Sequence, residues 1–478
     1  MPIAYRICGV WSIHNRSVDL IRSKKKEKLS VAMFKDDPVR PENYRRFERD
    51  VPQWFGDAKL GIFVHWGPYS VPAWAEPIGE LGTIEKEYWF KHNPYAEWYY
   101  NTIRIEDSPA AEHQREVYGG APYDDFLDQW DPAEFDPDEF IALVKSTGAG
   151  YFVPTTKHHD GVTLWDAPGT DDRNTVARGP RRDLVGAFEK ATRDAGLRFG
   201  VYYSGGLDWH FSQLPPITSE GQAFGRPVDA AYAEYAYRHV DDLIERYSPD
   251  ILWGDIEWPD AGKPSGPFSM EKLFEKFYAA RPDGVSNDRW GETHWDFRTS
   301  EYQQGTDVEA SGAWENCRGI GFSFGYNQVE DESHLLNGPD AVKSFVDIVS
   351  RGGNLLLNVG LTARGTVPDL QRRTLEHLAA WNAVNGDAVF ASTTLDTSIA
   401  PASDEPWVRW TRTGDTANAF VDATGPVRIA ASAGVDAASA RLADGTPIAV
   451  SRDGDALAVT VPEPAVAGPT LIRFDLAA

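Results

Sequence analysis

The chain has 478 residues, of which 47 are basic and 72 are acidic, so its formal charge at pH 7 is −25. Because phosphate contacts need clustered lysine and arginine, this charge argues against nucleic acid or an anionic membrane as a partner. The only cysteines, Cys8 and Cys317, are too few for a disulfide scaffold or for a zinc or iron–sulfur cluster.

The first 32 residues differ in character from the rest of the chain. They hold its only basic cluster, at 22–28, and show neither a hydrophobic period nor the apolar segment of a signal peptide. We expect residues 1–32 to be an N-terminal extension outside the fold, disordered or non-native, with an ordinary basic tail as the alternative. Because no run of about 18 apolar residues occurs, we also expect no membrane span and a cytoplasmic protein.

From residue 50 onward, short apolar runs of the β type alternate with helical patterns. Runs this apolar are typical of strands that are buried on both faces of a parallel sheet. We expect eight such strands, at residues 60–66, 150–155, 198–203, 250–253, 284–287, 295–302, 320–324 and 354–359. Helical stretches lie between most of them, at 136–145, 183–195, 230–246 and 341–350, and a further one follows at 370–381.

This alternation predicts an α/β fold, namely an irregular (β/α)8 TIM-like barrel over residues 33–386, and a doubly wound sheet is the alternative. The barrel should be irregular because residues 287–295 are too few for a helix between two strands. A long insertion at 68–123 should contribute to the face of the barrel on which active sites lie. After Gly386, short β runs separated by turn signals predict a small antiparallel β-sandwich domain over residues 387–478.

Polar and aromatic residues gather at the C-terminal ends of the predicted strands. In a parallel barrel these ends point into the active site. Successive strand ends carry His65, His158 with His159, Tyr202, Asp255, Arg289, Glu301 and Phe324. Five tryptophans also lie near this rim: Trp66, Trp98, Trp253, Trp258 and Trp290. Because the faces of tryptophan rings bind sugar rings, we expect some of the five to face a ligand.

The three histidines His65, His158 and His159 are candidate metal ligands, but their spacing is poor for that role. Adjacent residues on a strand point to opposite faces, so His158 and His159 should not share one ion. We therefore expect no metal and no other cofactor, and imidazoles that bind hydroxyl groups instead. The alternative for each histidine is a hydrogen-bonded place in a polar core.

Two carboxylates are candidates for catalysis. Asp255 directly follows an apolar strand, which favours a nucleophile or general base, although a helix N-cap is the alternative and Glu257 and Asp260 are close rivals. Glu301 would come from another strand, unless it is a surface residue paired with Arg298. Two carboxylates with many tryptophans, and with no phosphate-binding loop, indicate glycoside chemistry.

Eight blocks of the sequence resemble the α-L-fucosidases of glycoside hydrolase family 29, and bacterial members above all. They follow the order of that family from residue 54 to residue 360. The blocks are WFGDAKLGIFVHWGPYSVPAW (54–74), NPYAEWY (93–99), KHHDGVTLW (157–165), GVYYSGGLDW (200–209), PDILWGDIEW (249–258), NDRWGETHWDFRTSEY (287–302), WENCRGIGFSFGY (314–326) and GGNLLLNVG (352–360).

The resemblance implies an exo-acting, retaining hydrolase that releases terminal α-L-fucose from oligosaccharides or glycoconjugates. It implies Asp255 as the nucleophile and Glu301 as the acid/base, with Arg289 helping to keep Asp255 ionised and a raised pKa at Glu301. Trp98 and Phe324 should cover the C6 methyl of the sugar. The implied sugar-binding residues are His65, Glu97, Trp98, His158, His159, Tyr202, Trp253, Arg289 and Phe324.

Residues 303–313 differ from the family pattern, so the preferred leaving group stays open. Another retaining exo-glycosidase, such as an α-galactosidase, and a non-catalytic fucose-binding homologue are the alternatives. A homo-oligomer is possible on the sequence alone.

Overall fold

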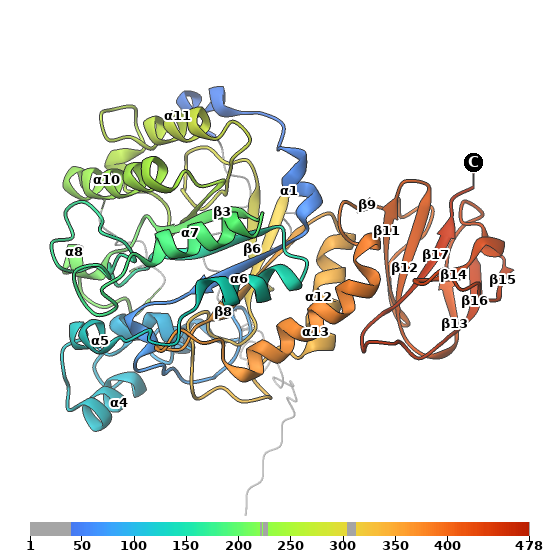
Figure 1. Cartoon of the computed structure of the whole chain (residues 1–478), viewed down its shortest axis with the longest axis horizontal. Helices are drawn as coiled ribbons and strands as arrows, with labels where there is room; N and C mark the ends of the chain where they lie inside the picture. Colours follow the sequence, from blue (N-terminus) through green and yellow to red (C-terminus); the bar gives the residue numbers. More distant parts are fainter. Residues whose placement is uncertain (1–39, 220–221, 223–227, 304–311, 478) are drawn as a thin grey trace, which may run out of the picture.

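The computed structural model describes residues 40–219, 222, 228–303 and 312–477. Its larger part is a barrel of parallel strands with helices around it, and its smaller part consists of two antiparallel sheets (Figure 1). The predicted extension at 1–32 lies outside the described residues.

The barrel strands lie in the order β5-β4-β3-β2-β1-β8-β7-β6, and each neighbouring pair is parallel. The barrel predicted from the sequence is therefore confirmed, and the doubly wound sheet is excluded. The strands are β1 (Leu60–His65), β2 (Tyr151–Lys157), β3 (Arg198–Ser204), β4 (Ile251–Asp255), β5 (Val285–Ser286), β6 (Arg298–Glu301), β7 (Trp314–Gly319) and β8 (Asn354–Gly360).

The strands β5 and β6 end this order and are joined by one parallel bridge, between Asn287 and Phe297. Asp296 reinforces the joint, because its backbone N–H donates to Ser286 O at 2.8 Å and its Oδ2 accepts the N–H of Ser286 at 2.8 Å. Residues 287–297 contain no helix. The irregularity of the barrel thus lies where the sequence is too short for a helix.

Helices cover the outside of the barrel, and further helices lie in the insertion that follows β1. The covering helices are α6 (Pro137–Ser146), α7 (Leu184–Asp194), α10 (Ala230–Tyr247), α11 (Met270–Ala280), α12 (Gly338–Ser350) and α13 (Asp369–Asn385). The insertion contains η2 (Pro68–Ser70), α2 (Lys86–Trp89), η3 (Ala96–Trp98), α3 (Tyr99–Thr102), α4 (Pro109–Tyr118) and α5 (Asp124–Gln129). The remaining short helices are η1 (Glu42–Phe47) and α1 (Gln53–Ala58) before β1, α8 (Trp209–Ser212) after β3 and η4 (Asp260–Gly262) after β4.

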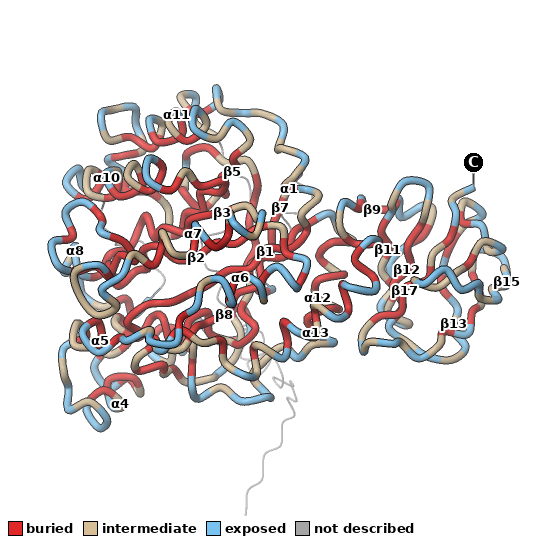
Figure 2. The backbone as a smooth tube through the Cα atoms, viewed as in Figure 1, coloured by how far each residue is buried: buried red, intermediate tan, exposed pale blue. Residues whose placement is uncertain are grey.

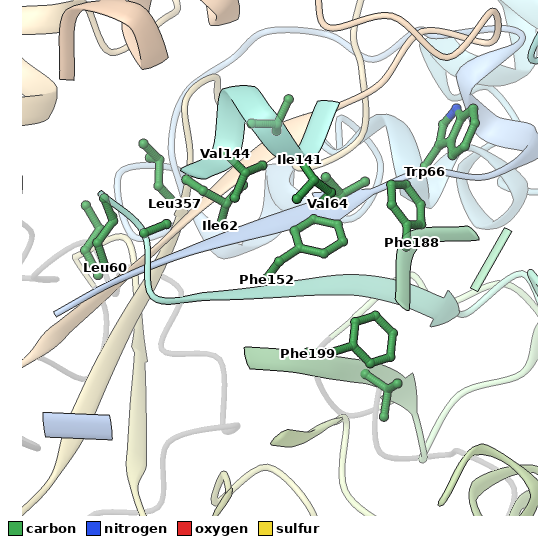
Figure 3. Close-up of a cluster of buried hydrophobic side chains, with 14 of the residues drawn as sticks. Leu60, Ile62, Val64, Trp66, Ile141, Val144, Phe152, Phe188, Phe199 and Leu357 are labelled. Atoms are coloured by element: carbon green, nitrogen blue, oxygen red, sulfur yellow. The ribbon is translucent and has the colours of Figure 1, made fainter. Parts of the chain in front are cut away.

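The two faces of each barrel strand have different partners. Leu60, Ile62, Val64 and Trp66 point outward, where they pack against helix residues such as Ile141, Val144 and Phe188 (Figure 3). Phe63, which has the opposite parity on β1, belongs to a separate cluster inside the barrel. Because side chains alternate along a strand, His65 points inward with Phe63. Figure 2 shows the barrel strands as almost wholly buried, whereas the surrounding helices carry both buried and exposed residues.

The C-terminal region contains a six-stranded and a three-stranded antiparallel sheet. Side chains from both sheets, such as Trp410, Phe474 and Val459, form one hydrophobic cluster between them, which confirms the predicted β-sandwich. The strands are β9 (Thr393–Thr394), β10 (Ser403–Asp404), β11 (Trp407–Thr413), β12 (Thr416–Asp422), β13 (Gly425–Ala430), β14 (Arg441–Leu442), β15 (Val450–Asp453), β16 (Ala456–Val461) and β17 (Thr470–Asp475), with η6 (Gly386–Ala388) and η7 (Ala437–Ser439) as short helices.

Helices α12 and α13 lie between the barrel and the sandwich (Figure 1). The buried ring of Trp381 on α13 packs against Phe420 at 5.9 Å, and its Nε1 donates to Pro469 O at 3.2 Å. Lys343 on α12 also forms a 2.6 Å ion pair with Asp422. The barrel and the sandwich are thus joined by apolar and polar contacts.

One predicted strand is wrong. The apolar run at 320–324 is a loop, and β7 lies just before it at Trp314–Gly319. This strand carries Glu315, Asn316 and Arg318, so an apolar-run criterion passes over it. The first two are buried and have partners: Glu315 accepts from Tyr151 inside the barrel, and Asn316, which has the opposite parity, donates to Ser300 Oγ at 2.8 Å.

In the part of the chain that the structure describes, no helix is both long and apolar enough to cross a membrane.

Candidate active site

The strand alternation brings the predicted site residues to the interior of the barrel. On β4, Trp253 belongs to the inner cluster and Leu252 to the outer one, so Asp255 points inward. Phe297 belongs to the inner cluster just before β6, so Glu301 points inward as well. Both carboxyl groups are nearly closed off from solvent, with Asp255 7% and Glu301 4% exposed.

One nitrogen of Arg289 contacts both carboxylates. Nη1 donates to Asp255 Oδ1 at 3.3 Å and to Glu301 Oε2 at 2.8 Å. The two oxygens can therefore be no further apart than the sum of these distances. The rest of the guanidinium is also held, since Nε donates to Thr299 Oγ1 at 2.9 Å and Nη2 lies 3.2 Å from Cys317 Sγ.

The other oxygen of Asp255 faces two further predicted residues. Tyr202 donates its hydroxyl proton to Oδ2 at 2.8 Å, and His159 Nε2 lies 3.9 Å from the same atom. Ser204 Oγ donates to Leu207 O, so at 2.7 Å it accepts from Nδ1 of His159. This places the proton of neutral His159 on Nδ1 and leaves Nε2 directed toward Asp255.

The other oxygen of Glu301 accepts from Tyr95, whose hydroxyl lies 2.8 Å from Oε1. Burial raises the pKa of Glu301, and the Asp255 charge raises it further, while the Arg289 charge and the two hydrogen bonds lower it. The net direction of the shift is upward, as expected for a general acid.

The three histidines lie together, but not as the strand pattern predicts. The rings of His158 and His159 lie side by side, 3.9 Å apart, because both residues follow the end of β2 and no longer alternate. The prediction that they face opposite ways is wrong. The ring of His65 lies 5.4 Å from His158, and its Nδ1 pairs with Asn358 Oδ1 at 2.7 Å. Burial lowers the pKa of all three histidines, that of His65 to about 3.

Glu97 holds the loop that carries Phe324. Its Oε2 accepts the backbone N–H of Gly325 at 2.7 Å and the hydroxyl of Ser323 at 3.1 Å, and burial raises the pKa of Glu97 to about 7. The ring of Phe324 lies 4.9 Å from that of His65. An apolar ring is thus fixed at the edge of the polar site.

The tryptophans near the rim divide into two groups. Trp98 and Trp253 belong to the inner cluster, where the ring of Trp98 meets His159 at 5.4 Å and that of Trp253 stacks on Tyr202 at 5.6 Å. The others, Trp66, Trp258 and Trp290, pack in the outer cluster, so only Trp98 and Trp253 of the five lie on the side of the site. The outward parity of Trp66 on β1 explains its place.

A sequence model described as alpha-L-fucosidase matches residues 29–387. An α-L-fucosidase of Dictyostelium discoideum is 30% identical over 357 residues, which cover 72% of each chain. A crystal structure of Thermotoga maritima α-fucosidase in complex with fucose is 41% identical, with a TM-score of 0.79, over 89% of this chain and 97% of that one. A complex of the same protein with a mechanism-based inhibitor is 42% identical, with a TM-score of 0.80, over 89% and 97% of the two chains.

The chain belongs to the α-L-fucosidase family of glycoside hydrolases. The resemblance noted from the motif blocks is therefore confirmed. Within the barrel of this α-L-fucosidase family member, the residues implied by those blocks share one interior site.

The rival carboxylates lie elsewhere in this α-L-fucosidase family chain. The backbone turns after Asp255, with positive φ angles at Ile256 and Glu257, and Glu257 Oε2 accepts from Lys263 Nζ at 2.6 Å. Asp260 accepts from the same nitrogen at 2.7 Å. Glu301 is buried on Arg289, whereas Arg298 lies beside Asp288, so the surface-pair alternative for Glu301 is excluded.

Sequence reasoning missed three residues of the α-L-fucosidase site: Tyr95, Asn358 and Glu315. Tyr95 lies in the insertion, 206 residues from its partner Glu301, and no local pattern marks that contact. Asn358 could have been found, since a polar residue in the apolar run of β8 must have a buried partner. The same reasoning identifies Glu315 only if residues 314–319 are first recognised as a buried strand.

No group of three or more His, Cys, Asp or Glu side chains is arranged to hold a metal ion within the described ranges.

Proposed function

We propose that this chain is an exo-acting, retaining α-L-fucosidase that hydrolyses terminal α-L-fucosyl residues of oligosaccharides or glycoconjugates. The observation that carries the proposal is that Asp255 and Glu301, from different strands, both contact Nη1 of Arg289. Their nearest oxygens are closer than the roughly 6.5–9.5 Å that an inverting enzyme needs for its water, which favours retention. Fucose bound to the related Thermotoga maritima structure supports the choice of sugar.

In the first step Asp255 attacks the anomeric carbon and forms a fucosyl ester, while Glu301 gives its proton to the leaving oxygen. In the second step Glu301 takes a proton from water, and the water oxygen displaces Asp255. The buried position of both carboxyls supports a pocket that admits a chain end, as an exo-acting enzyme requires.

The neutral histidines and Arg289 supply hydrogen bonds to the sugar hydroxyls in this scheme. His158 Nδ1 is buried without a hydrogen-bond partner in the described part of the chain, so a substrate hydroxyl can supply one. Phe324 and Trp98 offer an apolar wall for the C6 methyl group. A hydroxyl on C6, as in L-galactose, which is the 6-hydroxy counterpart of L-fucose, would lose water against such a wall without gaining a partner.

The sugar is tested by comparing nitrophenyl α-L-fucoside with nitrophenyl α-D-galactoside. We expect turnover of the fucoside and a kcat/KM for the galactoside that is lower by at least about 100-fold. Preference for the galactoside would identify an α-galactosidase-like enzyme. Fucose binding without turnover of either substrate would identify a non-catalytic binding protein.

The nucleophile is tested with Asp255→Gly and azide. We expect the variant to be inactive, and azide to restore turnover of an activated fucoside with β-fucosyl azide as the product. Glu257→Gly is the matched control, because this carboxylate lies two residues away and pairs with Lys263. Rescue of the control instead of Asp255→Gly would assign the nucleophile to Glu257.

A further inference from the structure

Tyr95 is a residue of the insertion that is fixed on three sides. Its ring packs against Trp89 at 4.9 Å and against Phe324 at 5.4 Å, and its backbone N–H donates to Asn93 Oδ1 at 2.9 Å. Only 7% of the residue is exposed. From this position its hydroxyl contacts Glu301 Oε1 at 2.8 Å. The hydroxyl is therefore held at the carboxyl group that the proposed mechanism uses as acid and base.

The two oxygens of Glu301 face partners of different chemistry. Oε2 faces Nη1 of Arg289, and a guanidinium can only donate hydrogen bonds. Oε1 faces the hydroxyl of Tyr95, which can donate or accept after a rotation about one bond. A proton on Oε2 would point at the N–H of Arg289, whereas a proton on Oε1 can be accepted by the phenol oxygen.

We propose that Tyr95 is a positioning residue for the acid/base, and this inference rests on the proposed function. Its hydroxyl accepts from protonated Oε1 of Glu301 before the reaction and donates to ionised Oε1 after it. In the first step the Oε1–H bond breaks, the proton goes to the leaving oxygen as its bond to the anomeric carbon breaks, and the carbon bonds to Asp255. Tyr95 keeps its own proton throughout.

The two states of this hydrogen bond differ in strength. Donation to a carboxylate is charge-assisted and about twice as strong as acceptance from a neutral carboxyl. Tyr95 therefore keeps the pKa of Glu301 lower than burial and the Asp255 charge alone would set it. The other charged or titratable groups that face Glu301 are Arg289, Glu97 and Cys317.

The test is Tyr95→Phe, which removes the hydroxyl and keeps the packed ring. The alkaline limb of the pH profile of kcat/KM reports the pKa of the acid in the free enzyme. We expect this limb to shift to higher pH by about 0.5–1 pH unit. We also expect kcat/KM for a fucoside with a poor leaving group to fall by about tenfold, and that for a dinitrophenyl fucoside by much less. A purely structural defect would lower kcat/KM for both fucosides alike and leave the alkaline limb of the pH profile in place. That result would overturn the proposal.

Tyr302→Phe is the matched control. Its ring also packs against Phe324 at 5.4 Å, but its hydroxyl donates to the backbone oxygens of Gly321 and Phe322. We expect the alkaline limb of this variant to stay where it is in the wild type, and an equal shift in both variants would overturn the proposal. Glu301→Gln tests the acid assignment separately from the role of Tyr95. We expect this variant to lose the alkaline limb of the pH profile. If the limb persists, Glu301 is not the acid, and the proposed function fails at that point.

Discussion

The guanidinium of Arg289 lies over the indole ring of Trp253, with 4.7 Å between the guanidinium carbon and the ring centroid. The ring itself is fixed, because its Nε1 donates to Glu315 Oε1 at 2.9 Å. The guanidinium is thus held over an aromatic ring, and its Nη1 carries the contacts to Asp255 and Glu301. Lysine has neither a flat face nor a fork of donors.

We therefore predict that Arg289→Lys lowers kcat/KM for an aryl fucoside by at least about 100-fold, since a point charge cannot hold both carboxylates and stack on Trp253. Steady-state kinetics on the purified variant measures this. The control is Arg298→Lys, a conservative change at an arginine that pairs with Asp288 at 3.4 Å. Equal losses in the two variants would contradict a special role for Arg289.

The ends of the strands explain why much of this site could be predicted from the sequence. His65, Asp255 and Glu301 each end a strand, and the C-terminal ends of parallel strands meet at one end of a barrel. Which face of a strand points inward could not be predicted, because strands such as β1 are apolar on both faces. Trp66 therefore lies next to His65 in the sequence, yet packs in the outer cluster.

The rest of the site depends on loops, whose geometry no local period describes. His158 and His159 lie side by side only because β2 ends at Lys157. Tyr95 reaches Glu301 through an insertion whose short helices carry no barrel pattern. The buried polar strand β7 was missed because Glu315 and Asn316 are accommodated by partners that are distant in sequence.

The junction between barrel and sandwich offers a test of stability. Trp381 is fully buried, packs on Phe420 and donates to Pro469 O. We predict that Trp381→Ala lowers the free energy of unfolding by about 3–5 kcal/mol, because it leaves a cavity between the two parts. Urea unfolding measures the change. Val384→Ala, on the same helix but 45% exposed, should cost well under about 1 kcal/mol.

A half-buried carboxyl that binds the loop carrying Phe324 predicts a pH dependence of stability. Glu330 Oε1 accepts the backbone N–H of Ser323 at 2.9 Å, and burial raises the pKa of Glu330 to about 8. A carboxyl whose pKa is higher in the folded chain stabilises the fold fully at pH values below the pKa that it has in the unfolded chain. For Glu330 this contribution is lost as the pH rises to about 8. The expected loss is on the order of a few kcal/mol.

Glutamine is neutral at every pH, so Glu330→Gln should lose less stability than the wild type between pH 5 and pH 8. Thermal unfolding of both proteins across this range measures the difference. Because Glu97 and Glu315 have raised pKa values of about 7 and contribute with the same sign, only the difference between the two curves is diagnostic. Glu376→Gln, at an exposed position, should follow the wild-type curve, and parallel curves for Glu330→Gln would refute the prediction.

The ring of Phe324 should act on the C6 methyl group of the sugar and not on its hydroxyls. It is held at the edge of the site, 4.9 Å from His65 and 5.4 Å from Tyr95. Removing an apolar contact with one methyl group costs about 1–3 kcal/mol. We predict that Phe324→Ala lowers kcat/KM for a nitrophenyl fucoside by about tenfold or more, and that for the analogue without the methyl group by less.

The ratio of kcat/KM for the two substrates decides this prediction. A loss of folded enzyme lowers both values by the same factor, so it cancels in the ratio. Phe322→Ala is the control in the same loop, since its ring lies against His334, 5.5 Å away, rather than against the site. We expect the ratio in this control to equal that of the wild type. If Phe324→Ala also leaves the ratio unchanged, the methyl group is recognised elsewhere, and Trp98, whose ring meets His159 at 5.4 Å, is the next residue to replace.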